Sequence, residues 1–191
     1  MNFDISQLQH YQWVLGIASG LVIGMAKTGI SGLTLFFIPL MALSFGSRAS
    51  TGIILPMLCI GDIFAVAWYR RHGEMKYILR LLPSTLFGIG SGVVVGRSLS
   101  DNTFGIMIGS IILALLALMI WQDASKKNNL YPSAWWFSSL AGLLAGFTTM
   151  IGNAAGPVMS IYLLSMRMPK NTFIGTAAWF FMIINLLKIP L

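Results

Sequence analysis

The chain has 191 residues, of which 57% are hydrophobic and only 9% are charged. Soluble globular domains carry about 25% charged residues, so this composition excludes an ordinary soluble domain and indicates a membrane protein. The formal net charge is +7, but the basic residues fall mostly in short breaks between apolar stretches. That distribution follows the positive-inside rule and gives no reason to expect a nucleic-acid partner.

The first apolar stretch covers residues 13–45 and holds a polar break, KTGISG, at residues 27–32. A continuous helix of that length would extend ~50 Å against a hydrocarbon core of ~30 Å, whereas two full spans would need more residues. The break divides the stretch into two half-helices. They could form one broken span, or they could enter the membrane and return to the same face.

The following segments approach the ~20 residues that a membrane-spanning helix needs. One span ends near Trp68, and residues 77–96 and 104–121 supply two more. A second glycine-rich break, TTMIGNAAGP, occupies residues 148–157, and its Pro157 suits the first turn of a new half-helix. Residues 171–187 form the last candidate span. We therefore predict an all-α polytopic membrane protein, with residues 1–191 as a single integral membrane domain.

A weak internal repeat relates the two halves of the chain. A glycine pair precedes each break, in GLVIG and in GLLAG, and a basic turn follows it. A second glycine and a buried polar residue then follow at equal spacing: Gly29, Gly52 and Asp62 in the first half, and Gly152, Gly175 and Asn185 in the second. The spacing predicts repeats at 13–121 and 133–191, the second incomplete at the C-terminus.

The placement of basic residues favours breaks that re-enter the membrane. If both broken segments crossed, the two faces would carry six and four basic residues, which is a poor bias. If both segments return to the face from which they entered, one face carries only Arg48 and Arg97 and the other carries eight basic residues. The N-terminus then lies outside. Each complete half then crosses three times, so the second repeat is inverted relative to the first.

Paired breaks at membrane depth predict a binding site, because non-helical backbone there must be buried in protein or line a wet cavity. Half-helix N-termini favour anions, glycines allow close approach, and hydroxyl and amide groups donate hydrogen bonds. For any single glycine, tight helix packing is the simpler interpretation. The predicted substrate-binding residues are Lys27, Thr28, Gly29, Ser31, Gly32, Thr149, Gly152, Asn153 and Gly156.

Charged residues at depth extend this hypothesis. A lysine near the bilayer centre costs at least ~2.5 kcal/mol, so Lys27 should face a cavity or a partner unless it snorkels to an interface. Asp62 lies near the midplane of its span, where it could pair with Lys27 or carry a proton. We assign Asp62 and Asn185 as candidate coupling residues. Thr149 stands near the position of Lys27 in the second repeat, so we expect one lysine at the site, with Lys188 snorkelling.

Other chemistry has little support in the sequence. His10 and His72 lie outside the predicted spans, and Cys59 is the only cysteine, so we expect no catalytic residue, metal site or cofactor. GISG, with Ser31, matches the nucleophile pattern of intramembrane serine proteases, but no histidine lies at depth to activate it.

The residues around both breaks resemble the TauE/SafE group, also called the sulfite exporter or TSUP family of bacterial membrane transporters. The resemblance rests on GMAKTGISGLTLFFIPL, STGIILPMLCIGDIFAVAWYRRH, AGFTTMIGNAAGPVMSIYLL and PKNTFIGTAAWFFMIINLLKIPL. It implies a multi-pass protein of the bacterial inner membrane that exports or takes up small sulfur-containing anions such as sulfite or organosulfonates, with two inverted repeats around a central site. Protons are a candidate coupling ion because of Asp62. The alternative is a scaffold or assembly subunit that transports nothing. The sequence leaves the oligomeric state, the direction of transport and the substrate open.

Overall fold

The structure is a computed structural model that describes residues 9–27, 33–124 and 135–191. Four of the predicted binding residues lie outside the described residues: Thr28, Gly29, Ser31 and Gly32. Every regular element in the described part is helical, which confirms the all-α prediction. The elements are α1 (His10–Ala26), α2 (Leu33–Phe45), α3 (Ser47–Tyr69), the 3₁₀ turn η2 (Arg70–His72), α4 (Met75–Ser98), α5 (Asp101–Ala124), α6 (Trp135–Gly152), α7 (Gly156–Ser165) and α8 (Lys170–Lys188).

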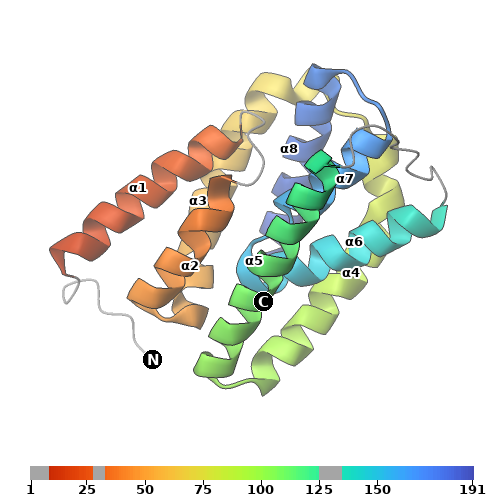
Figure 1. Cartoon of the computed structure of the whole chain (residues 1–191). Helices are drawn as coiled ribbons and strands as arrows, with labels where there is room; N and C mark the ends of the chain where they lie inside the picture. The colour runs from red at the N-terminus through yellow and green to blue at the C-terminus, as the bar shows by residue number, and fades with distance from the viewer. Residues whose placement is uncertain (1–8, 28–32, 125–134) are drawn as a thin grey trace.

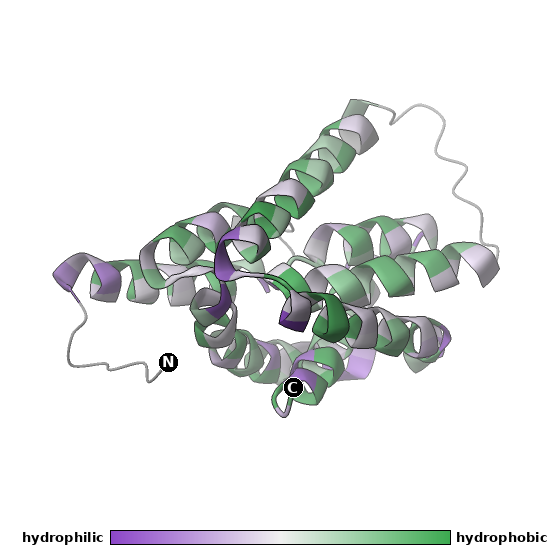
Figure 2. Ribbon diagram, turned by 90° about the horizontal axis from the view of Figure 1, so that it is seen from below, coloured by the Kyte–Doolittle hydropathy of each residue, from purple (hydrophilic) through white to green (hydrophobic). Residues whose placement is uncertain are grey.

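Three stretches are long and apolar enough to cross a membrane, judged by length and composition: Ser47–His72, Met75–Ser98 and Asp101–Trp121. Hydrophobic residues run along the helices, as the green ribbon of Figure 2 shows. Many large apolar side chains are exposed, among them Phe64, Trp68 and Phe87. Side chains of this kind suit a surface that faces lipid, because acyl chains solvate them as well as a protein core does.

The first broken segment turns back on itself. At the start of α1, Nε2 of Gln12 donates to the carbonyl of Ser44 near the end of α2, at 2.7 Å. The far ends of the two helices therefore lie together, and α1 and α2 form an antiparallel hairpin (Figure 1). The hairpin has the geometry expected of a re-entrant pair.

The second broken segment has the same form. The ring of Phe137, early in α6, stacks on the ring of Tyr162, late in α7, with centroids 6.3 Å apart. The helices are separated only by Asn153–Ala155, and Pro157 lies in the first turn of α7 as predicted. Asn153 has φ 53°, a left-handed conformation that asparagine tolerates better than most residues.

The two hairpins enter the bundle from opposite ends. Gly46 joins the first hairpin to the start of α3, whereas the second hairpin leads into the start of α8. Helices α3 and α8 run antiparallel, because the backbone N–H of Glu74, just beyond α3, donates to Thr176 near the start of α8 at 3.0 Å. The end of α1 and the start of α7 consequently overlap in the middle of the bundle.

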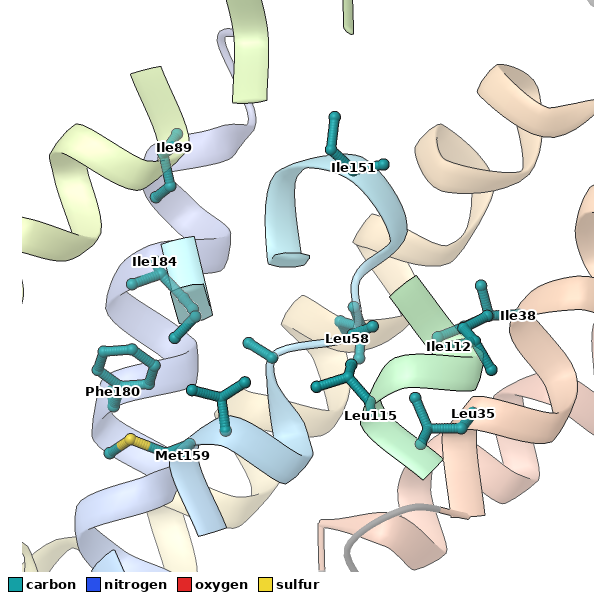
Figure 3. Packing of buried hydrophobic residues seen from close by; sticks show 14 of the residues in the cluster. Leu35, Ile38, Leu58, Ile89, Ile112, Leu115, Ile151, Met159, Phe180 and Ile184 are labelled. Carbon is teal, nitrogen blue, oxygen red and sulfur yellow. The ribbon is translucent and has the colours of Figure 1, made fainter. Parts of the chain in front are cut away.

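The buried core surrounds this overlap. Figure 3 shows Leu58 of α3 beside Ile112 and Leu115 of α5, with Phe180 and Ile184 of α8 nearby. The largest side chains with almost no exposed surface include Tyr162, Phe180, Leu35 and Met41. They come from both hairpins and from α8, so hydrophobic packing joins the two hairpins to α8.

Helices α4 and α6 pack at backbone distance through glycines. A Cβ at Gly146 would lie 2.9 Å from the backbone N of Ile89, and one at Gly88 would lie 2.9 Å from the backbone N of Phe147. Neither contact leaves room for a side chain. The glycine pair of GLLAG therefore serves helix packing, the simpler of the two interpretations of a membrane glycine.

This packing predicts that Gly88→Ala lowers the stability of the folded protein. The added methyl group must push α6 away, and overpacking of this kind costs about 1–3 kcal/mol. The matched control is Gly90→Ala, two residues along the same helix, where an added Cβ meets nothing within 4 Å. Thermal unfolding in detergent measures both variants, and equal midpoints would contradict the assignment.

Candidate functional site

A buried ion pair joins the first hairpin to α3. Asp62 is 0% exposed, and its Oδ1 lies 2.5 Å from Nζ of Lys27, which caps the end of α1. The ammonium also lies 4.8 Å from the ring centroid of Phe181 on α8, within the range of a cation–π contact. The predicted pairing of Lys27 with Asp62 is confirmed, and it neutralises both charges where water is scarce.

The second oxygen of Asp62 binds the residue that matches it in the other half of the chain. Nδ2 of Asn185, on α8, donates to Oδ2 of Asp62 at 2.7 Å. The sequence places the two residues at equal spacing after their breaks, and the structure brings them into direct contact. Asp62 thus holds together the tip of the first hairpin, α3 and α8.

Among the residues discussed from the sequence, Lys188 has the position that differs most from the one predicted. Instead of snorkelling, it is 5% exposed, and its Nζ donates to three acceptors at the second break. These are the carbonyl of Thr149 at 3.0 Å, Oγ1 of Thr149 at 3.0 Å and Oδ1 of Asn153 at 2.6 Å. An ammonium has three donors, so all of them are satisfied.

The expectation of a single lysine at the site is therefore wrong. Thr149 lies near the end of α6, much as Lys27 lies at the end of α1, but the ammonium of Lys188 reaches Thr149 from α8. The carbonyl of Thr149, in the last turn of α6, also accepts from the backbone N–H of Asn153 at 3.0 Å, and the helix dipole at this end attracts a cation. Each first half-helix thus ends beside a lysine, although the two lysines hold different places in the sequence.

A cavity of about 90 Å³ lies between the hairpin tips. Four predicted binding residues line it: Lys27, Thr149, Asn153 and Gly156. The polar lining also includes Asn185 and two residues that the sequence analysis missed, Thr34 and Ser160. The volume can hold several waters or a small anion.

Gly152 is not brought to this cavity. A Cβ at Gly152 would meet Ile108 of α5 at 3.7 Å, so this glycine faces α5. Thr34 and Ser160 were missed because each lies inside an apolar helix, one turn or so from a break. The signal that could have identified them is a polar residue within about one helical turn of a break.

The second hairpin turns its positive helix end toward the cavity. Gly156 begins α7 and lines the cavity, while the first helix-type bond to α7 runs from the N–H of Met159 to the carbonyl of Ala155, at 3.0 Å. The N–H groups that precede Met159 lack partners within the helix. Together with the helix dipole they favour an anion in the cavity.

The buried charges do not cancel. Within the described residues the buried or nearly buried ionisable side chains around the breaks are Lys27, Lys188 and Asp62, two cations and one anion. Lys27 is compensated by Asp62, whereas all three partners of Lys188 are neutral. With Lys188 protonated, the cluster carries one positive charge that no group in the described part of the chain balances.

A metal centre has no visible set of ligands in the described part of the chain. No group of three or more His, Cys, Asp or Glu side chains there could hold a metal ion. The arrangement instead offers what a transient anion site needs: a cavity, donors and uncompensated positive charge.

Comparison with known proteins identifies the family. The family model described as Sulfite exporter TauE/SafE matches residues 16–191. No curated protein and no solved structure matched the chain. The family match covers α1 from Gly16 onward, α2 to α8 and all three charged residues of the cluster. It confirms the resemblance: the chain belongs to the TauE/SafE family of sulfite exporters, a family of membrane transport proteins.

Proposed function

We propose that this protein is a secondary transporter of small anions of the sulfite or organosulfonate class in the bacterial inner membrane. The observation that carries the proposal is the unbalanced charge of Lys188 beside a cavity lined by Thr149 and Asn153. Two opposite charges ~4 Å apart attract by about 4 kcal/mol at an effective dielectric constant of ~20. A monovalent anion in the cavity would neutralise the cluster.

The opposed hairpins support transport by alternating access. If residues 13–121 and 133–191 are inverted repeats, each contributes one hairpin that enters from its own face, and both tips meet at the cavity. Rocking of one half against the other would then expose the cavity to one face at a time. The two halves meet where α4 packs against α6 and where α3 runs antiparallel to α8, so this movement would involve both contacts.

Asp62 gives the cluster a way to couple anions to protons. Protonation of Asp62 would remove the only negative charge of the cluster and raise its net charge from +1 to +2. An anion would then bind more tightly. Because linkage is reciprocal, a bound anion would favour protonation of Asp62 to the same extent. The expected mode is movement of anion and proton in the same direction.

The first prediction concerns Lys188. Replacing it with methionine removes the unbalanced charge, so uptake of radiolabelled sulfite into proteoliposomes should fall at least tenfold. Lys188→Arg keeps the charge and should retain part of the activity, which separates charge from folding. Lys170→Met, at the exposed start of α8, is the matched control. Equal uptake by Lys188→Met and the control would contradict the proposed site.

A second prediction tests coupling through Asp62. Asp62→Asn keeps the size of the side chain but cannot bind a proton. Uptake of methanesulfonate, whose charge is constant over the neutral range of pH, should lose its pH dependence in this variant. Because the anion does not titrate, any remaining dependence belongs to the protein. A pH profile identical to that of the unaltered protein would remove Asp62 from the coupling step.

A third prediction separates the structural role of the ion pair from its transport role. Lys27→Met leaves a buried carboxylate without its cation, which costs about 3–5 kcal/mol in comparable pairs. The double variant Lys27→Met/Asp62→Asn should recover most of the thermal stability in detergent, yet transport without pH dependence. If the single and double variants unfold at the same temperature, the two side chains are not coupled.

A further inference from the structure

A second, larger cavity lies on the other side of Lys188. It has a volume of about 320 Å³ and sits where α3 begins and α4 ends. Its polar lining is formed by Arg48, Thr51, Arg97, Asn153 and Lys188, and we call it the basic cavity. Leu55 and Phe104 contribute to its apolar walls. The volume falls in the range of small-molecule sites.

The basic cavity concentrates positive charge. Three cations line it, Arg48, Arg97 and Lys188, and no Asp or Glu is among its described lining residues. Like charges around a cavity with apolar walls repel one another, and they raise the local concentration of anions. A bound anion would relieve that repulsion.

The arginines are arranged for different tasks. Arg48 is fixed, because its guanidinium donates to the carbonyls of Gly96, at 2.7 Å, and Leu99 and lies 5.4 Å from the ring centroid of Phe104. Arg97 is exposed, and among the described residues its side chain has no recorded hydrogen bond or ion pair. A guanidinium offers parallel N–H donors that match the oxygens of an oxyanion. Arg97 is therefore free to bind one.

A thin partition separates the basic cavity from the central one. Asn153 lines both, and its side chain joins the two walls: Nδ2 donates to the carbonyl of Thr51 at 3.1 Å, while Oδ1 accepts from Lys188 at 2.6 Å. The backbone of Asn153 is in the left-handed region, at φ 53°. Residues held in such conformations cluster at sites where a protein switches or clamps a ligand.

We propose that the basic cavity is a second anion site, which binds a small oxyanion between Arg97, Arg48 and Lys188. The anion passes to the central cavity when the bond between Lys188 and Asn153 opens. Binding at this site stands on the geometry of the basic cavity alone, whereas the transfer rests on the proposed transport function. Lys188 serves both cavities, because its ammonium forms part of the partition.

Equilibrium binding of radiolabelled sulfite to the purified full chain tests the proposal. We expect two anions to bind per chain, and one in Arg97→Gln. Arg97→Lys keeps the charge without the paired donors and should bind the second anion more weakly. The matched control is Arg71→Gln, an exposed arginine at the opposite end of α3, which should bind two. In proteoliposomes, Arg97→Gln should raise the KM for uptake about tenfold with little change in the maximal rate.

The outcomes separate the two proposals. A single site in the unaltered protein that Arg97→Gln leaves unchanged would overturn the second site and leave the central one. Two sites that both survive in Arg97→Gln would also overturn it. If the unaltered protein binds two anions, and Arg97→Gln one, while neither moves sulfite across the bilayer, the second site stands and the transport function fails.

Discussion

The structure depends on how two ammonium groups and one carboxylate are held inside an apolar bundle. Each charge would be costly there alone, by at least ~2.5 kcal/mol even on the lenient insertion scale. Asp62 meets this constraint by accepting from Lys27 and Asn185, and Lys188 meets it with three neutral acceptors. These bonds join both hairpins to α3 and α8, so satisfying the charges also fixes the arrangement of the helices.

The breaks supply what a continuous helix could not. A regular helix consumes its own N–H and C=O groups, whereas an end at mid-bundle leaves several of them free. At the end of α6 the carbonyl of Thr149 accepts from Lys188 as well as from the N–H of Asn153, and the start of α7 turns N–H groups toward the central cavity. Carbonyls bind the protein's own cation, which leaves the N–H groups for an anion. One hairpin tip thus provides both polarities within a few residues.

The helices and the two breaks could be predicted from the sequence, because apolar periodicity and helix-breaking residues are local properties. Apolar stretches set the helices, glycine and proline set the breaks, and depth along one helix suggested that Asp62 and Lys27 would pair. Lys188 could not be placed in this way. Its depth depends on which neighbour α8 lies against, and a lysine near the end of an apolar segment looks the same whether it snorkels or binds a hairpin tip. The glycines of GLLAG were likewise ambiguous until the distance to α4 was known.

If the two halves are repeats, the direct contact of Asp62 with Asn185 accounts for the difference in charge at their equivalent position. Equivalent residues meet when they lie beside an axis that relates two halves of a chain. Two carboxylates in contact there would repel strongly, and one would have to be protonated. An aspartate facing an asparagine keeps one hydrogen bond and one ionisable group at the centre. A single proton on Asp62 therefore suffices to change the charge of the whole cluster.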